Sequence, residues 1–264
     1  MVGGSATAVV TGAAMGMGRD ISRKLIGDGV SVVGLDLNAT ALEETCAELG
    51  EAFEPLVGDV GDWDAHERAA DMAERRGELR HWVNNAGIDI IGGAHEVTPQ
   101  HIEDGLRVLQ LGVMFGCAIA VRRMLPARRG SIVNISSIQG VAAWPRYFVY
   151  DAAKAAILMA TKSVALDYAP YGLRCNVVLP GNIDTPMFRA GIPADPAERE
   201  SWLEGEAALA PMLRIGHPSE ISEVVSFLLS DRASFVNGAE VIVDGGAMVR
   251  CFPHPPIDVG PPGL

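Results

Sequence analysis

Short apolar runs alternate along the chain with longer segments whose apolar residues recur at helical spacing. The runs predict seven strands, at Ala6–Thr11, Ser31–Asp36, Glu54–Gly58, His81–Asn84, Ser131–Ser136, Arg174–Leu179 and Glu240–Val243. The longer segments predict helices at Gly18–Asp28, Ala39–Leu49, Asp64–Arg76, Gln100–Leu125, Phe148–Tyr168 and Pro218–Leu229. Strands that alternate with helices form parallel sheets, so we expect a single α/β domain with a doubly wound, seven-stranded parallel sheet and helices on both faces. Such sheets bind ligands at the carboxyl ends of their strands.

Two segments interrupt this alternation. Residues 185–212 contain four prolines around a short helical piece. A long irregular excursion after a strand often covers an active site, so we expect a substrate lid here, with an ordinary surface insertion as the alternative. The tail 251–264 holds five prolines and cannot form a helix or a central strand, so we expect it outside the domain of residues 1–250.

The composition is that of a globular protein, with 48% hydrophobic and 20% charged residues. A formal charge of -12 argues against nucleic acid as a partner. Neither a signal peptide nor a run of about 18 apolar residues is evident, so no membrane association is expected. The four cysteines lie far apart in the sequence without a C-x-x-C motif, which favours a reducing compartment, the cytoplasm. We expect no metal, because His95, His101 and His217 lack partners at ligand spacing.

The first chemical motif runs from Thr11 to Gly18 and leads from the first strand into the first helix. Its glycines, Gly12 and Gly16 among them, let the backbone approach a pyrophosphate, which free N–H groups of the helix N-terminus can bind. Asp36 ends the second strand 18 residues beyond Gly18, where a carboxylate can accept hydrogen bonds from an adenosine ribose. Its charge repels a 2′-phosphate, and neither Met15 nor Leu37 supplies a cation, so the expected cofactor is NAD. The alternative role for Asp36 is a helix cap or a turn residue.

The second motif pairs Tyr150 with Lys154 on a predicted helix. Residues four apart share one face, about 6 Å apart along the axis. A free tyrosine has a pKa near 10, but a neighbouring ammonium and the positive nicotinamide of NAD+ both favour the phenolate. Tyr150 is therefore expected to accept or donate the proton of a secondary alcohol. The alternative is a tyrosine that only packs in the helix.

These motifs resemble the short-chain dehydrogenase/reductase family, in its branch of about 250 residues with T-G-x-x-x-G-x-G, N-N-A-G and Y-x-x-x-K, and a Rossmann fold. The matches extend to about residue 247. The resemblance implies that Ser137 binds the reacting oxygen and that Lys154 also binds the nicotinamide ribose. It further implies cofactor contacts from Gly12, Met15, Gly16, Met17, Asp36, Leu37, Asp59, Val60, Asn85, Ala86, Gly87, Pro180, Gly181, Ile183 and Thr185, with Asp59 on the adenine and the segment from Pro180 on the carboxamide.

One position departs from the family pattern. Where the family has V-N-x-x-G, this chain has Val108-Leu109-Gln110-Leu111-Gly112, so Leu109 replaces an Asn that the family associates with a proton-relay water. Leucine cannot hydrogen-bond that water. Gln110 takes over the role only if the helix is locally rewound. Slower catalysis, a rerouted water chain and loss of catalysis are the possible consequences, and we expect a working enzyme with an altered relay.

The resemblance places the substrate beside Ser137, Gln139, Trp144, Tyr150, Asn182 and Met187, with Asp89, Ile90, Val141, Tyr147, Phe188 and Trp202 nearby. Most are apolar or aromatic, which favours a hydrophobic, cyclic or steroid-like alcohol or ketone. Trp144 and Tyr147 have plain packing as the alternative. The family also pairs the helices from Gln100 and Phe148 between subunits, which implies a homotetramer.

Two other functions fit less well. The first is a non-catalytic NAD-binding sensor or scaffold on the same fold, for which Leu109 is the argument. The second is a nucleotide-sugar epimerase or dehydratase, which usually needs a larger C-terminal substrate domain. The sequence determines neither the substrate's identity nor the physiological direction.

Overall fold

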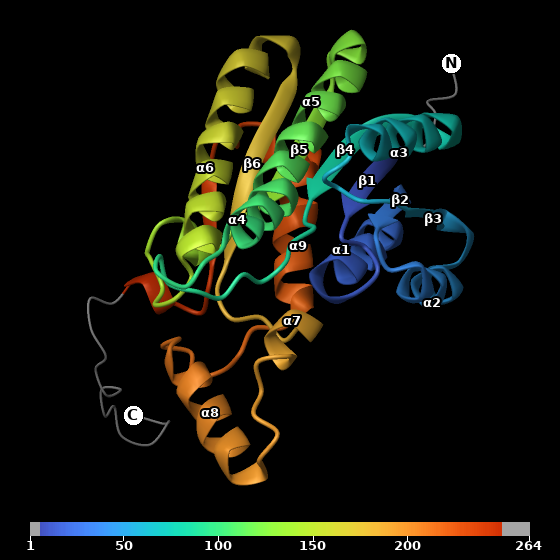
Figure 1. The fold of residues 1–264 in the computed structure, drawn as a ribbon. Coiled ribbons are helices and arrows are strands. Elements are labelled where there is room, and N and C mark those ends of the chain that lie inside the picture. Colours follow the sequence, from blue (N-terminus) through green and yellow to red (C-terminus); the bar gives the residue numbers. More distant parts are fainter. Residues whose placement is uncertain (1–5, 250–264) are drawn as a thin grey trace, which may run out of the picture.

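The computed structural model describes residues 6–249, so the proline-rich tail and Cys251 lie outside the described part. Its seven strands form one parallel sheet in the order β3-β2-β1-β4-β5-β6-β7 (Figure 1). Their bounds are β1 Ala6–Thr11, β2 Ser31–Asp36, β3 Phe53–Val57, β4 Glu78–Asn84, β5 Gly130–Ile135, β6 Leu173–Pro180 and β7 Glu240–Val243. The predicted doubly wound sheet is confirmed, with every strand within three residues of its expected bounds.

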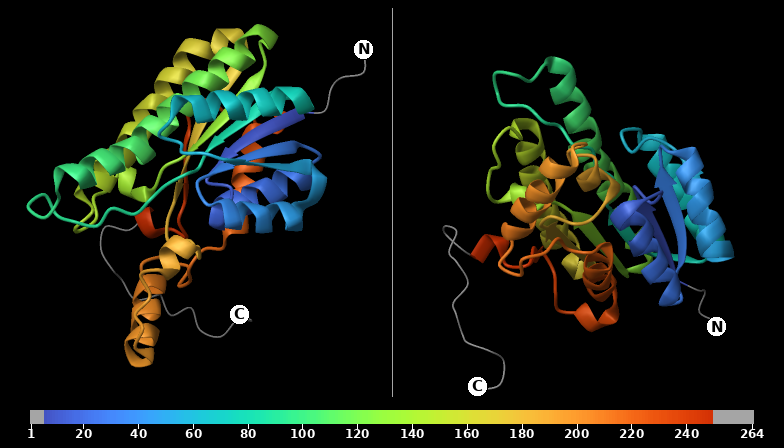
Figure 2. Two further views of the ribbon diagram at one scale, coloured as in Figure 1. Left: turned by 45° about the vertical axis from the view of Figure 1, so that its right-hand side comes forward. Right: turned by 90° about the horizontal axis from the view of Figure 1, so that it is seen from below.

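Helices cover both faces of the sheet (Figures 1 and 2). Their bounds are α1 Gly16–Gly27, α2 Ala39–Leu49, α3 Trp63–Arg76, α4 Pro99–Gly105, α5 Gly112–Met124, α6 Phe148–Tyr168, α7 Pro186–Arg189, α8 Pro196–Ala208 and α9 Pro218–Leu229. Residues of α3, α5 and α6 form one core with the sheet, while residues of α1, α2 and α9 form the other. The two layers leave the carboxyl ends of the strands open for a site.

The helix expected over 100–125 is broken into α4, a π-helix over Leu106–Leu111, and α5. By length and composition alone the run 99–127 is long and apolar enough to cross a membrane, although Arg107, Gln110 and Arg122 interrupt its apolar residues. Half of its most apolar 18-residue window is buried, because α5 packs against β4 and α3. We therefore interpret it as a core helix.

Residues 185–212 form more helix than expected. They contain α7 and α8, and α8 projects beyond the carboxyl edge of the sheet in Figure 1 and in the left view of Figure 2. Two aromatic rings join the helices, since Phe188 lies 5.2 Å from Trp202 between centroids. The segment is therefore placed where it can cover the strand ends.

A buried polar network crosses the centre of the sheet. Asn84 of β4 donates to Asn134 of β5 at 2.8 Å, and Trp82 donates to Asn84 at 2.9 Å. Cys117 and Cys175, far apart in sequence, both contact Asn134 and hydrogen-bond each other. Because an unpaired amide in a core is costly, each Asn fixes the alignment of its neighbours.

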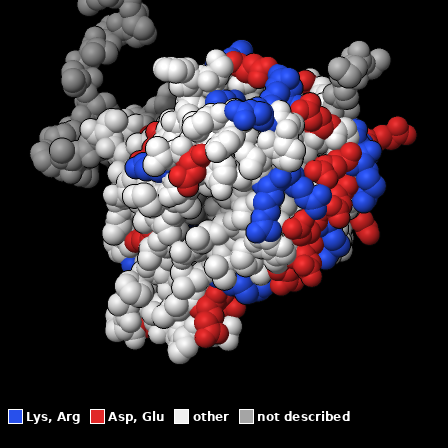
Figure 3. Space-filling model, turned by 90° about the horizontal axis from the view of Figure 1, so that it is seen from above, with Lys and Arg blue, Asp and Glu red and all other residues white. Residues whose placement is uncertain are grey.

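Charges on the surface are paired rather than segregated. Arg123 of α5, for example, forms ion pairs with Glu67, Asp71 and Glu74 of α3 at 2.6–2.8 Å. The face in Figure 3 shows acidic and basic side chains interleaved along one side, and the described residues form no basic patch there.

The guanidinium of Arg174 caps the end of α9. It donates to the carbonyl oxygens of Leu228, Leu229 and Ser230 at 2.7–3.2 Å, and to that of Val236 at 3.3 Å. The last carbonyls of a helix lack partners within the helix, so a cation there satisfies them and interacts favourably with the helix dipole.

We predict that Arg174→Met destabilises the fold by about 3 kcal/mol, because several half-buried carbonyls lose their donor. The thermal midpoint, followed by circular dichroism, should fall by roughly 5–10 °C. Arg129→Met is the matched control, since Arg129 pairs only with the exposed Asp231 and such surface pairs contribute at most about 1 kcal/mol. Equal effects of the two variants would contradict the capping role.

Candidate active site

The glycine-rich turn between β1 and α1 packs directly on the N-N-A-G segment after β4. Gly12 has φ +66°, and a Cβ there would lie 2.7 Å from the Cα of Ala86. A Cβ on Gly18 would lie 1.9 Å from the carbonyl oxygen of Gly12. Only glycine fits these two positions. At both, a side chain would collide with neighbouring backbone, and at Gly12 the backbone is also left-handed.

Hydrogen bonds hold this contact in place. The Thr11 hydroxyl accepts from the backbone N–H groups of Asn85 and Ala86 at 2.9 and 3.0 Å. The Asn85 amide donates to the carbonyls of Thr11 and Gly12 at 3.0 and 3.2 Å. Its Oδ1 is buried without a protein partner among the described residues. Gly87 follows and lies beside Lys154, so this segment joins the turn to the catalytic candidates.

The turn fits a dinucleotide. No side chain caps the N-terminus of α1 at Met15, and the first turn of α1 contains no acid, so its N–H groups can meet a pyrophosphate. Met15 and Met17 pack on the core beside the turn. Gly16, with φ +56°, brings the turn against Thr185 and Pro186, since its Cβ would lie 3.4 Å from either side chain. The cofactor candidates Thr185 and Gly16 are thus together.

Asp36 lies at the end of β2 beside the turn, and both carboxylate oxygens accept backbone hydrogen bonds. Oδ2 accepts from Ala14 at 3.0 Å and Oδ1 accepts from Asn38 at 2.9 Å. A carboxylate has further lone pairs on each oxygen, so it can still accept from ribose hydroxyls. Leu37 is 69% exposed. Asp36 is therefore hydrogen-bonded to the backbone of Ala14 and Asn38, and these contacts are compatible with a further hydrogen bond from a ribose hydroxyl.

Asp59 is paired within the protein. Its Oδ2 accepts from Arg107 at 2.6 Å, and its Oδ1 accepts from the backbone of Gly61 at 2.7 Å. Burial acts to raise its pKa, but these two hydrogen bonds together hold the pKa below its usual value. Val60 is buried in a small core with Leu35. Sequence reasoning missed Arg107, because 48 residues separate it from Asp59 and no motif links them.

The segment after β6 sits beside the end of β7. Pro180 pairs with Val243 in the sheet, and Gly181 donates its N–H to the Val243 carbonyl at 3.0 Å. A Cβ on Gly181 would lie 2.9 Å from Asp244. Ile183 is buried and bridges to Gly216, so the segment that could hold a carboxamide is fixed by the fold.

Tyr150, Ser137 and Lys154 converge at the carboxyl end of β5. Ser137 follows the strand, and its hydroxyl lies close enough to the Tyr150 phenol to lower the pKa of that phenol. The Lys154 Nζ lies 5.5 Å from the centre of the Tyr150 ring and donates to the Ile135 carbonyl at 3.0 Å. Lys154 is only 4% exposed. The predicted constellation is therefore assembled in space.

Protonation in this cluster differs from the sequence-based expectation. Burial raises the pKa of Tyr150 well above its ordinary value, and the Asp89 carboxylate adds to the rise, while the Ser137 hydrogen bond lowers it. Burial lowers the pKa of Lys154 to about 8. The lowered phenol pKa expected from the adjacent lysine is thus not produced by the protein groups alone, because desolvation of the phenolate outweighs them.

Leu109 occupies the wall beside the lysine. It is fully buried, and its Cδ2 and the Lys154 Nζ both lie within 4 Å of the position that a Cβ on Gly87 would take. The helix is locally rewound here as a π-helix, yet Leu109 and not the half-buried Gln110 points at this position. The polar group of the family's Asn is replaced by a methyl surface.

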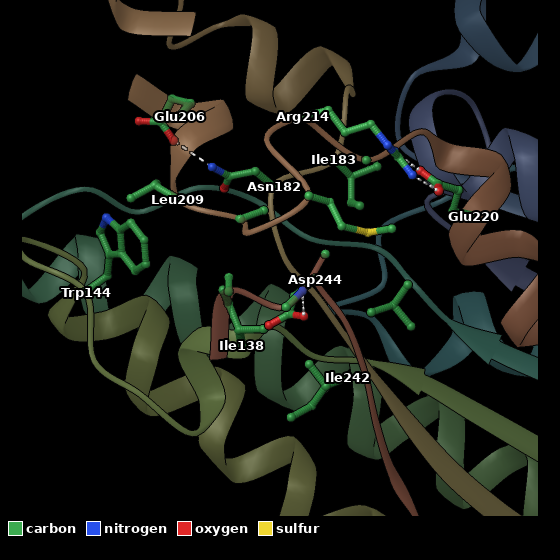
Figure 4. A pocket seen from close by; sticks show the side chains of 17 residues that line it. Ile138, Trp144, Asn182, Ile183, Glu206, Leu209, Arg214, Glu220, Ile242 and Asp244 are labelled. Atoms are coloured by element: carbon green, nitrogen blue, oxygen red, sulfur yellow. Dashed lines mark hydrogen bonds and ion pairs between the residues drawn. The ribbon is translucent and has the colours of Figure 1, made fainter. Parts of the chain in front are cut away.

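A cavity of about 330 Å³ opens beside the Ser137 loop (Figure 4). It is lined by Ile138, Trp144, Asn182, Ile183, Glu206, Leu209, Ala210, Met212, Arg214, Gly216, Glu220, Ile242, Val243, Asp244, Gly245, Gly246 and Ala247. Of the residues predicted to bind the substrate, Trp144 and Asn182 line this cavity. Ser137, Gln139, Tyr150 and Met187 are not in the lining: Gln139 donates its backbone N–H to the Ser137 hydroxyl, and Met187 is 42% exposed on α7.

No motif or spacing in the sequence predicts several of the residues that line the cavity. Glu206 of α8 accepts from the Asn182 amide at 2.6 Å, although 24 residues separate them. Arg214 and Glu220 close another side of the cavity as a bidentate pair. The described residues contain no group of three or more His, Cys, Asp or Glu side chains that could hold a metal ion.

Known proteins match almost the whole chain. Residues 12–248 match the family model described as Enoyl-(Acyl carrier protein) reductase. The chain is 36% identical to 2-(R)-hydroxypropyl-CoM dehydrogenase of Xanthobacter autotrophicus, over 91% of this chain and 98% of the relative. It is also 36% identical to 3beta-hydroxysteroid dehydrogenase 2 of Eggerthella lenta, over 91% and 94%.

A solved structure shares the fold. Aldohexose dehydrogenase of Thermoplasma acidophilum superposes with a TM-score of 0.86 at 33% identity, over 96% of this chain and 98% of that one. The glycine turn, the N-N-A-G segment and the Tyr-Lys pair thus identified the family correctly. This chain belongs to the short-chain dehydrogenase/reductase family of oxidoreductases.

Proposed function

We propose that this protein is an NAD(H)-dependent oxidoreductase that interconverts a hydrophobic, cyclic secondary alcohol and its ketone. The convergence of Tyr150, Ser137 and Lys154 at the end of β5 carries the proposal. This cluster adjoins the glycine turn through Gly87, so a dinucleotide bound at the turn can extend toward it. The similarity to dehydrogenases named for secondary alcohols supports the same reaction class.

In this proposal, bound NAD supplies the hydride acceptor, and bound NADH the hydride donor. Ser137 positions the reacting oxygen by a hydrogen bond. Tyr150 accepts the alcohol proton during oxidation and donates it during reduction. Lys154 binds the nicotinamide ribose and, with the positive nicotinamide ring, offsets the burial that raises the pKa of Tyr150.

The preference for NAD rests on Asp36. Its carboxylate lies beside the glycine turn, held by the backbone of Ala14 and Asn38, and its charge disfavours a 2′-phosphate. Asp59, Val60, Asn85 and Ala86 complete the proposed adenosine site. Pro180, Gly181, Ile183 and Thr185 complete the proposed nicotinamide site.

The proposed substrate lies between the Ser137 loop and the segment 185–212, which acts as a lid. Trp144, Ile138 and Leu209 give the cavity apolar walls suited to a ring. We also propose a homotetramer, because α5 and α6 expose Met114, Met159 and Leu166. The three cysteines in the described part of the chain are free, which fits a reducing cytoplasm.

A second candidate function is a non-catalytic NAD-binding sensor on the same fold. Leu109 favours it, because a methyl surface replaces the polar relay group beside Lys154. The intact Ser137, Tyr150 and Lys154 cluster favours the enzyme.

We predict that Tyr150→Phe lowers kcat for oxidation of hydrophobic secondary alcohols by about 10²–10⁴-fold, since it removes the general acid and base. NADH binding, followed by nicotinamide fluorescence, should persist. Tyr168→Phe, at the other end of α6, is the control and should keep its activity. Full activity of Tyr150→Phe would refute the assignment. A wild-type protein that binds NADH but oxidises no alcohol of the panel would favour the sensor.

We predict that Asp36→Asn raises the KM for NAD+ about tenfold or more and improves kcat/KM for NADP+, because the charge facing the ribose is lost. Glu48→Gln, an exposed acid on α2, is the control. Steady-state kinetics with both cofactors would measure the ratio of kcat/KM for NAD+ to kcat/KM for NADP+. If this ratio is unchanged in a folded Asp36→Asn protein, Asp36 only holds the backbone of the turn and does not select the cofactor.

We predict that Leu109→Asn keeps the fold and gives a kcat equal to or higher than that of the wild type, since a polar group beside Lys154 can bind a relay water. The kcat and its pH profile should be measured together with the thermal midpoint. Leu111→Asn, on the same π-helix but 41% exposed, controls for changes in the helix. Loss of activity in folded Leu109→Asn would show that this position has another role.

A further inference from the structure

The cavity beside the Ser137 loop has an apolar body and one polar corner. Trp144, Ile138 and Leu209 contribute to the body. The polar corner is the hydrogen-bonded pair of Glu206 and Asn182, which Figure 4 shows joined above Leu209 and Trp144. A ring that fills the body would therefore meet a carboxylate at one end.

The position of Glu206 is not explained by the stability of its helix. It lies in the last turn of α8, which ends at Ala208. A carboxylate near a helix C-terminus interacts unfavourably with the helix dipole, and the short bond from the Asn182 amide offsets this at one oxygen only. The second oxygen, Oε1, can accept another hydrogen bond.

The charge of Glu206 also acts on the start of the catalytic helix. Burial raises the pKa of Tyr147, and the charges of Asp89, Glu206 and Asp151 add to the rise. The Tyr147 ring in turn lies 5.8 Å from the Tyr150 ring between centroids. The Glu206 carboxylate is therefore close enough to Tyr147, which neighbours the proposed reacting centre, to act on its pKa.

The cations around this region are already paired. Arg214, the single Lys or Arg among the described residues that line the cavity, forms a bidentate pair with Glu220. On α7, Arg189 forms a bidentate pair with Asp184 at 2.6 and 2.8 Å. A carboxylate, sulfonate or phosphate on the substrate would therefore be repelled by Glu206. Neither Arg214 nor Arg189 is free to pair with it.

We propose that Glu206, oriented by Asn182, is a specificity-determining residue that accepts a hydrogen bond from a donor group, a hydroxyl or an ammonium, on the far side of a cyclic substrate. This proposal rests on the proposed function and narrows its substrate to a ring with a second, donating substituent. A site built around a charged acceptor discriminates against analogues that lack the donor, because the carboxylate is then desolvated without a partner.

Four cyclohexanols that differ only at the fourth ring position test this. The position carries hydrogen in cyclohexanol, a hydroxyl in trans-1,4-cyclohexanediol, an ammonium in trans-4-aminocyclohexanol and a carboxylate in trans-4-hydroxycyclohexanecarboxylate. For the wild type, we expect kcat/KM for the diol or the amine to exceed that for cyclohexanol about tenfold, mainly through KM, and the carboxylate to be the poorest. The better of the first two identifies the donor as hydroxyl or ammonium.

Variants then assign the preference to the residue. Glu206→Ala should bring the kcat/KM values for the diol, the amine and cyclohexanol within about twofold of one another. Glu206→Gln, which keeps an acceptor without the charge, should keep part of the diol preference and lose most of the amine preference. Glu204→Gln is the control, because Glu204 is exposed on the same helix. A donor preference that is absent in the wild type, or that survives in Glu206→Ala, would overturn the proposal.

A binding measurement separates this proposal from the proposed function. With NADH bound, no alcohol is oxidised, and ligand-observed NMR titration gives the Kd of each ring for the wild type and for Glu206→Ala. Tighter binding of the diol or amine that is lost in Glu206→Ala supports the donor subsite even if no turnover is found, which would refute the proposed function alone. Equal binding of all four rings refutes the subsite even if cyclohexanol is oxidised.

Discussion

The site depends on one buried ammonium. Lys154 is 4% exposed, and no carboxylate within residues 6–249 pairs with it; its Nζ donates to the carbonyl of Ile135 at the end of β5. Burying an ammonium costs free energy, which appears as the lowered pKa of about 8. The helix that carries the lysine is fixed to the same strand end, because the Ser136 hydroxyl donates to the Lys154 carbonyl at 2.8 Å. This contact between the end of β5 and α6 therefore sets the relative positions of Ser137 and Tyr150.

The same burial acts on the phenol in the opposite sense. It raises the pKa of Tyr150, and the Asp89 charge adds to this, so the protein groups favour the protonated phenol. In the proposed reaction that state suits ketone reduction, in which Tyr150 donates its proton. Oxidation needs the phenolate, which a positive nicotinamide ring beside Tyr150 would favour. The protonation of Tyr150 would then follow the redox state of the cofactor, with Lys154 as a constant contribution.

Sequence reasoning succeeded where contacts are local or carry a period. The strands, most helices and the family could be predicted, because alternating strands and helices leave few topologies, and the glycine turn and the Tyr-Lys spacing are local. It failed where distant residues meet. The Arg107 partner of Asp59 and the π-helix at Leu106–Leu111 depend on packing that no spacing encodes. The extra helix in 185–212 was underestimated because its prolines were read as breaks, whereas Pro186 and Pro196 begin α7 and α8.

The site accordingly has two parts, one positioned by the sheet and one by the segments that cover the strand ends. The residues proposed for the cofactor and the proton lie on strand ends and the adjoining helix starts, where the backbone of the doubly wound sheet fixes them. The residues proposed for the far end of the substrate come from the end of α8 and from the turn after β7, which contribute Glu206, Leu209 and Asp244 to the cavity. Because α8 buries none of its residues and is joined to the strand ends through Asn182, its sequence can change with little cost to the core. Substrate choice can therefore vary among chains that keep the same sheet and the same proton chemistry.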